Sequence, residues 1–144
     1  MRIVDEVKLD FKDVLFVPKR STLKSRSEVD LTREYTFRNS GQTYSGIPIM
    51  AANMDGVGTF DMAPELEKSS LFPCLVKSYS LEDWGKHHPM IGCSHQAVST
   101  GISDQDWEKL QVILYGVSRI KYICIDVANG ASTQLIKIVD KIRI

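Results

Sequence analysis

Polar residues that could bind a ligand follow each of four short apolar runs, which cover residues 47–52, 72–77, 96–100 and 121–128. The polar ends read Asn53-Met54-Asp55-Gly56, Lys77-Ser78-Tyr79, Ser99-Thr100-Gly101 and Asp126-Val127-Ala128-Asn129-Gly130. Carboxylates, amides and a lysine in such places suit hydrogen bonds to ligand hydroxyls, amides or phosphates. Because all four runs become polar at the same end, they indicate one shared ligand-binding edge.

Asp126 and Lys77 are the strongest candidates at this edge. Asp126 follows a buried-strand pattern and precedes Asn129-Gly130, a natural turn pair. Its carboxylate either accepts hydrogen bonds from a ligand or only closes the turn and caps the next helix. Lys77 is either a surface lysine with a packed stem or a cation beside Asp126 and Asp55. The residues alone leave both alternatives open.

A basic segment lies near the amino terminus, in VPKRSTLKSRSEVD (residues 17–30). Its four basic residues have no acidic residue between them and are interleaved with hydroxyls: Lys19, Arg20, Lys24 and Arg26, with Ser21, Thr22 and Ser25. Most short charge clusters are solvated loops. The alternative is a phosphate contact, because clustered cations and hydroxyls suit an anionic ligand.

Two other patterns favour structural roles. The segment 87–95 contains His87, His88, Cys93 and His95, which are zinc-ligand types, but adjacent histidines do not readily face one metal and no paired thiolates occur. We therefore predict no metal site. Gly56-Val57-Gly58 lacks the rest of a dinucleotide fingerprint, so its glycines are expected to permit a strand-to-helix turn. Cys124, inside an apolar run, is expected to be a packed core thiol.

The segments between the runs have helical patterns. Ser80 and Ser103 are predicted N-caps, and Pro64 fits the first turn of a helix. Near the carboxyl terminus, one apolar stripe contains Leu135, Ile138, Val139 and Ile142. Strand and helix alternating four times predict an α/β fold with a parallel sheet, which gathers ligand groups at the carboxyl ends of its strands. Residues 1–46 are expected to form an irregular lead-in segment, and residues 47–144 four βα units.

Composition also bears on the partners and the location of the protein. Eighteen basic and eighteen acidic residues give a formal net charge of zero, so no nucleic-acid or anionic-membrane partner is expected. No apolar run reaches the ~18 residues of a membrane span, and the first residues lack the apolar core of a secretory signal. Three widely spaced cysteines favour reduced thiols and a cytoplasmic location.

Residues 8–60 (KLDFKDVLFVPKRSTLKSRSEVDLTREYTFRNSGQTYSGIPIMAANMDGVGTF) resemble the amino-terminal region of the guanosine monophosphate (GMP) reductase family. The resemblance continues through VKSYSLEDW, AVSTG and KYICIDVANG. The present sequence differs from the family at Gly56, where the family usually has Thr, and at Ser78, where the family commonly has His. The family, with inosine monophosphate dehydrogenase, consists of (β/α)8 barrels. The resemblance therefore implies roughly half of a TIM barrel.

The resemblance also implies a chemistry: reductive deamination of GMP to inosine monophosphate (IMP) with NADPH. Ser25 and Arg26 match residues that reach the cofactor of a neighbouring subunit in a homotetramer. Lys77, Asp126, Val127 and Ala128 match cofactor-binding residues within the subunit. The family's catalytic residues and its monovalent cation site are expected beyond Ile144, so we expect no catalytic residue and no turnover in this chain. The alternatives are a non-catalytic short form that acts as a subunit-interaction module, and an inosine monophosphate dehydrogenase fragment, against which the amino-terminal motifs argue.

Overall fold

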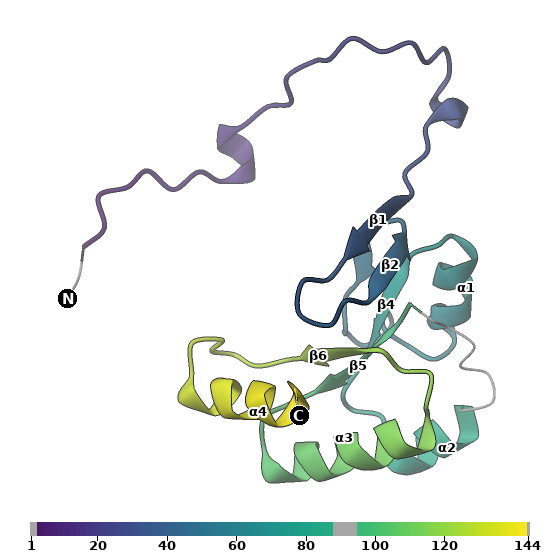
Figure 1. Ribbon diagram of the computed structural model, residues 1–144, viewed down its shortest axis with the longest axis vertical. Coiled ribbons are helices and arrows are strands. Elements are labelled where there is room, and N and C mark those ends of the chain that lie inside the picture. Colours follow the sequence, from purple (N-terminus) through teal and green to yellow (C-terminus); the bar gives the residue numbers. More distant parts are fainter. Residues whose placement is uncertain (1–2, 88–94, 144) are drawn as a thin grey trace. The chain divides into compact units, whose positions relative to one another are not determined.

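The computed structural model describes residues 3–87 and 95–143. The chain divides into two units, Met1–Asp30 and Leu31–Ile144. Two short 3-10 helices occur in the first unit, η1 (Phe11–Asp13) and η2 (Arg26–Glu28) (Figure 1). Every described residue of this unit is exposed. Residues 3–30 therefore form no apolar core of their own.

The second unit contains a hairpin and a four-stranded parallel sheet (Figure 1). In the hairpin, β1 (Arg33–Thr36) pairs with β2 (Thr43–Gly46). The parallel strands are β3 (Met50–Ala51), β4 (Phe72–Leu75), β5 (Ala97–Thr100) and β6 (Tyr122–Ile125), and they lie in chain order. The helices that follow them are α1 (Met62–Lys68), α2 (Leu81–His87), α3 (Asp104–Gly116) and α4 (Thr133–Arg143). The predicted alternation of strands and helices is confirmed.

Two helices begin at the predicted serine caps. The Ser103 hydroxyl accepts a hydrogen bond from the Asp106 amide (3.1 Å), and the Asp106 carboxylate accepts one from the Ser103 amide (3.1 Å). Ser80 and Asp83 make the same reciprocal pair, at 3.1 and 2.8 Å. These bonds satisfy backbone donors that a helix start leaves without partners. Pro64 lies in the first turn of α1, as predicted.

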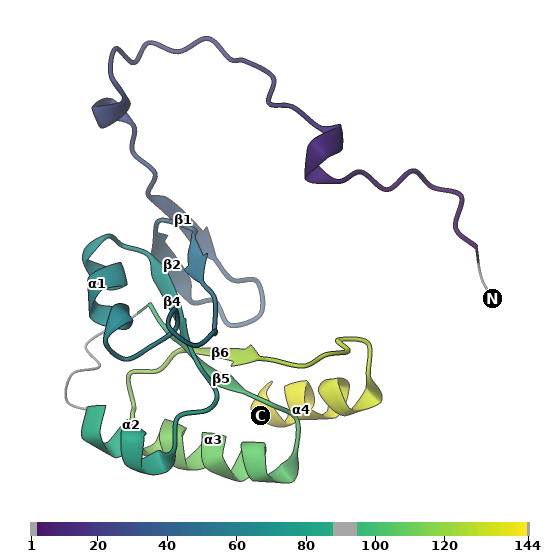
Figure 2. The ribbon, with the colours of Figure 1, turned by 180° about the vertical axis from the view of Figure 1, so that it is seen from behind.

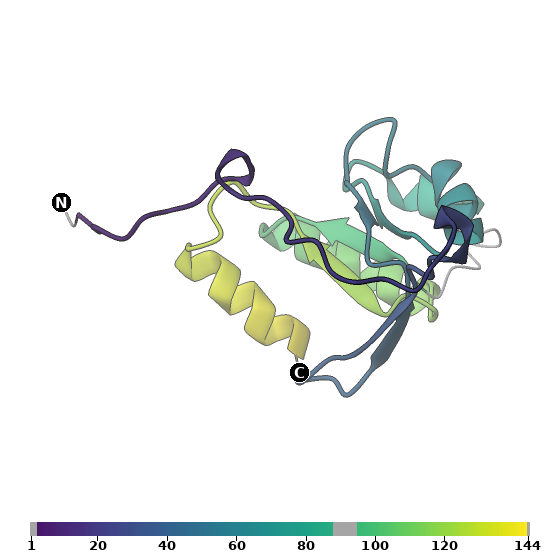
Figure 3. The ribbon, with the colours of Figure 1, turned by 90° about the horizontal axis from the view of Figure 1, so that it is seen from above.

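One face of the parallel sheet packs against helices. Leu75 of β4 and Val98 of β5 are neighbours in register and are almost fully buried. They form one apolar cluster with residues of the helices and the loop before α1: Phe60, Ala63, Trp84, Leu110, Ile113 and Val117. Helices α2 and α3 lie side by side (Figure 2), and α4 runs alongside the sheet near β6 (Figure 3). The predicted stripe on α4 is confirmed, with Ile138 buried and the other three residues partly buried.

The opposite face, which we call the open face, carries the alternate residues of the same strands. Phe72, Cys74 and Ala97 are buried there with Tyr44 of the hairpin, and Tyr122 and Cys124 pack against them. The Phe72 ring lies 5.0 Å from the Tyr122 ring, across the intervening β5. An apolar cavity of about 570 Å³ remains on this face. Its lining residues are Tyr35, Phe37, Tyr44, Pro48, Met50, Phe72, Ala97, Lys121, Tyr122, Ile123, Cys124 and Ile142.

The loop between β3 and α1 depends on its glycines, as predicted. Gly56 has a φ of +77°, a conformation that costs a residue with a side chain roughly 1–2 kcal/mol. Gly58 donates its amide to the Met54 carbonyl (3.0 Å), and its own carbonyl accepts a hydrogen bond from Val76 (2.9 Å). The loop is thereby held against the end of β4. Within residues 3–87 and 95–143, no helix is long and apolar enough to cross a membrane.

Candidate functional site

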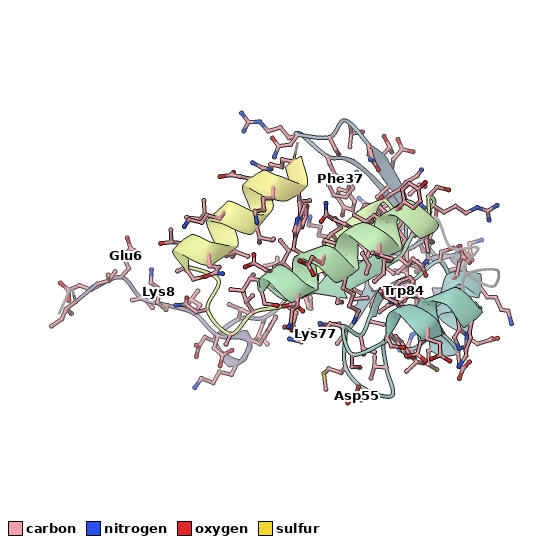
Figure 4. All side chains as sticks on the ribbon, turned by 90° about the horizontal axis from the view of Figure 1, so that it is seen from below. Glu6, Lys8, Phe37, Asp55, Lys77 and Trp84 are labelled. Carbon is pink, nitrogen blue, oxygen red and sulfur yellow. The ribbon has the colours of Figure 1, made fainter. Side chains whose placement is uncertain are left out.

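The carboxyl edge of the parallel sheet brings Lys77 and Asp126 together. Lys77 follows β4 by two residues, Asp126 directly follows β6, and β5 lies between the two strands. The Lys77 Nζ lies 3.0 Å from Asp126 Oδ2. Parallel strands end at the same edge, so residues 49 positions apart in the chain meet there. Figure 4 labels Lys77, together with Asp55 on the loop after β3. Asp55 is exposed.

The ion pair remains open to solvent. The side chains of Lys77 and Asp126 are 50% and 43% exposed. Exposed ion pairs of this kind contribute only about 0–1 kcal/mol to stability. The pair therefore adds little to the fold, and both charged groups are accessible to a ligand.

Hydrogen bonds hold the backbone of both residues of the ion pair. The Asp126 amide donates to the Thr100 carbonyl at 2.8 Å, which extends the pairing of β5 and β6 by one residue. The Lys77 carbonyl accepts a hydrogen bond from Lys109 Nζ at 2.7 Å. Lys109 lies on α3, 32 residues further along the chain. The sequence pattern did not predict Lys109, because no local spacing relates a helix lysine to a distant strand end.

A second carboxylate, Asp106, lies close to both lysines. Its Oδ2 accepts a hydrogen bond from the Ser103 hydroxyl at 2.6 Å. This hydrogen bond holds the pKa of Asp106 below its ordinary value, and the positive charges of Lys77 and Lys109 lower that pKa further. A Cβ atom at Gly101 would lie 2.3 Å from Asp106 Oδ2, so a side chain at this position would displace the carboxylate. Two lysines, Lys77 and Lys109, and two carboxylates, Asp106 and Asp126, thus lie together at this edge.

Val127 and Ala128, the other predicted cofactor contacts on this unit, continue directly from Asp126. Val127 is partly buried and Ala128 is exposed. The predicted turn follows, where the Asn129 side-chain oxygen accepts a hydrogen bond from the Ala131 amide at 3.0 Å. This turn leads the chain from the carboxyl edge into α4 and leaves Ala128 accessible beside Asp126.

Ser25 and Arg26, the predicted contacts in the basic segment, belong to the first unit. The Ser25 hydroxyl caps η2 by accepting a hydrogen bond from the Ser27 amide at 3.3 Å. Arg26 is the first residue of η2 and is exposed, as are the three other basic residues of the segment. Both residues are therefore accessible to a ligand. Their role in phosphate binding stays a prediction.

The cysteines described by the structure lie on the open face. Burial, together with the neighbouring Cys124, raises the pKa of the Cys74 thiol to about 11. Cys124 is partly buried against the same apolar cluster, which agrees with the expected packed thiol. Of the histidine-rich segment, residues 88–94 lie outside the described residues. In the part of the chain that is described, no group of three potential ligand side chains could hold a metal ion.

The fold and this edge define a class: an α/β protein with a parallel sheet and charged, accessible side chains where its strands end. Proteins of this class bind ligands at that edge. The chain is homologous to part of the GMP reductases, as its sequence predicted. It is 53% identical over 145 residues to GMP reductase 1 of Rattus norvegicus and 55% identical over 145 residues to GMP reductase 2 of Homo sapiens.

A bacterial GMP reductase, from Citrobacter koseri, is 51% identical over 146 residues. These alignments cover 98–99% of the present chain but only 41–42% of each relative. The chain thus spans less than half the length of the curated relatives it matches. No protein-family model matches the chain.

Proposed function

We propose that this chain is the amino-terminal part of a GMP reductase and supplies cofactor-binding residues to that enzyme. The reaction would be the NADPH-dependent reductive deamination of GMP to IMP. The observation that carries the proposal is the ion pair of Lys77 and Asp126 at the carboxyl edge, in a chain about half identical to GMP reductases. As the resemblance implies, the enzyme would be a cytoplasmic homotetramer.

The proposal includes a barrel architecture in which the four parallel strands are the first half of a (β/α)8 barrel. Their order in the sheet follows their order in the chain, as in such barrels. Phe72 and Tyr122, from alternate strands, touch on the open face. Layers of a barrel interior are built from alternate strands in this way. The contact therefore supports a sheet that curves toward closure.

The hydrogen-bonding side chains at the edge fit a nicotinamide dinucleotide. The Asp126 carboxylate can accept hydrogen bonds from ribose hydroxyls or a carboxamide, and the Lys77 ammonium can donate to an oxygen of the cofactor. When bound, NADPH would supply the hydride for the reduction. Val127 and Ala128 would line the cofactor beside Asp126. Ser25 and Arg26 would bind phosphate in a neighbouring subunit, since an arginine offers the fork that suits phosphate.

Direct binding of NADPH to the 144-residue chain tests this proposal. We expect calorimetric titration to detect NADPH binding. Asp126→Asn and Lys77→Met should each weaken it about tenfold, the scale of one lost charge-assisted hydrogen bond. The matched controls are Asp140→Asn and Lys68→Met, which remove equal charges from exposed positions on α4 and α1. Absence of NADPH binding, or equal effects of site and control variants, would contradict the proposal.

Turnover is a separate measurement. We propose that purine attack and deamination use residues that the resemblance assigns beyond Ile144, so the chain alone should not oxidise NADPH in the presence of GMP. IMP formation that depends on this chain would contradict that part of the proposal while leaving cofactor binding intact.

A non-catalytic interaction module is the second candidate, and the open face favours it. The apolar cavity there is rimmed by large exposed side chains, including Met50 (62% exposed) and Tyr35 (50% exposed). Exposed apolar patches of this kind commonly mark interaction sites. Size-exclusion chromatography of the chain, alone and mixed with a full-length GMP reductase, tests the module. A monomer in both experiments would contradict it.

A further inference from the structure

We infer that Lys109 is a positioning residue that holds Lys77 in place for ligand binding, an inference that rests on the proposed function of Lys77. Lys109 touches the site through the peptide backbone of Lys77. Its Nζ donates to the Lys77 carbonyl at 2.7 Å, from α3 to the loop after β4. Lys109 matches none of the residues that the sequence resemblance assigns to cofactor binding.

The Lys109 contact falls in a stretch of the loop after β4 between two other anchors. The pairing of β4 with β5 ends at Leu75. The next residue, Val76, donates its amide to the Gly58 carbonyl. The next anchors are the Tyr79 hydroxyl, which accepts from the Phe60 amide at 3.1 Å, and Ser80 at the start of α2. Lys77 lies between these anchors. Lys109 supplies the protein hydrogen-bond donor to the Lys77 carbonyl in this stretch.

The charges around Lys109 make this contact compatible with the ion pair. A second lysine beside Lys77 would compete with it for Asp126. Asp106, one turn before Lys109 on α3, is a nearby counter-charge for Lys109. Its carboxylate is held by Ser103 at 2.6 Å, and the fields of both lysines favour its charged form. Asp106 thus partly offsets the positive charge of the two lysines, while Asp126 pairs with Lys77 at 3.0 Å.

The first test compares Lys109→Met with Lys109→Arg in calorimetric NADPH titrations of the 144-residue chain. Methionine retains the apolar stem without the donor, whereas arginine retains a charged donor. We expect Lys109→Met to weaken NADPH binding about tenfold, the scale of a hydrogen bond made by a charged group. Lys109→Arg should restore most of the affinity. The matched control is Lys68→Met, an exposed lysine of α1 whose loss should have no effect.

A double-mutant cycle separates positioning from direct contact with the ligand. We expect Lys109→Met to have no further effect on NADPH binding in a Lys77→Met background, because Lys109 acts through Lys77. An equal loss in both backgrounds would overturn the inference, since Lys109 would then act on the ligand independently. A drop in thermal stability without any change in affinity would overturn it as well.

A measurement without cofactor distinguishes failure of this inference from failure of the proposed function. Amide ¹⁵N relaxation should show that residues 77–79 become more mobile in Lys109→Met and return to the wild-type order parameters in Lys109→Arg. If the wild-type chain does not bind NADPH, the proposed function fails, and the relaxation result still decides the positioning role. Unchanged order parameters in Lys109→Met would overturn that role.

Discussion

A Cβ atom at Gly58 would lie 1.9 Å from the carbonyl oxygen of Cys74, so the loop after β3 packs directly on the backbone of β4. The obstacle is backbone, which cannot rotate away as a side chain could. This contact sets the path of the chain from β3 to α1. It also places the Gly58 carbonyl where the Val76 amide can donate to it, just before Lys77.

We expect Gly58→Ala to lower the free energy of unfolding by about 3 kcal/mol, in the range of core overpacking and lost backbone pairing. Urea unfolding followed by circular dichroism measures this value. Gly85→Ala is the matched control, because Gly85 lies in α2 and an added Cβ there would meet open space. That control should raise stability by about 1 kcal/mol through helix propensity. Equal effects of the two variants would contradict the close packing.

Cys74 should make the chain less stable at high pH. Burial raises the pKa of its thiol from 9.0 to about 11 in the folded state. Between these values the unfolded chain releases the proton while the folded chain retains it, so stability falls as pH rises through this window. Relative to the Cys74→Ala variant, the wild type should lose about 1 kcal/mol between pH 8 and pH 10. Parallel pH profiles of the two proteins would contradict this assignment.

Asp106 should have the opposite pH dependence. Its pKa is lowered, first by the hydrogen bond from the Ser103 hydroxyl, so the folded chain binds this proton less readily than the unfolded chain. The resulting stabilisation is present above the ordinary carboxyl pKa and is lost as pH falls through the lower, folded value. Thermal unfolding between pH 6 and pH 2 measures the effect. The decline should be shallower in Asp106→Asn, and an unchanged slope would refute the contribution of Asp106 to the pH dependence.

Tyr79 should stabilise the loop before α1 by its hydroxyl. This oxygen accepts a hydrogen bond from the Phe60 amide at 3.1 Å, while the two rings stack 4.1 Å apart. Tyr79→Phe keeps the stacking but leaves a part-buried amide without this acceptor, which should cost about 1–2 kcal/mol. Tyr115→Phe removes an equal hydroxyl from a side chain that is 93% exposed and should change nothing. Chemical denaturation of both variants compares the costs.

Much of the fold could be predicted from local patterns. Apolar runs and serine caps predicted the order of strands and helices, and α2 and α3 begin where Ser80 and Ser103 indicated. Strand β3, the first strand of the parallel sheet, is shorter than the apolar run over 47–52 indicated. Pro48 has no amide to donate, and the Ile49 amide bonds locally to Ile47, so regular pairing begins only at Met50.

Polar strand ends also predicted Lys77 and Asp126 as candidates at one edge. Sequence by itself determined these residue types and their places at the ends of strands, because hydrophobic periodicity and capping are local properties of the chain. Only the tertiary structure decided that the two side chains pair at 3.0 Å and that Lys109 holds the Lys77 backbone. Such contacts join residues 32 and 49 positions apart, and they arise from the register of parallel strands and the packing of α3, which no local pattern encodes.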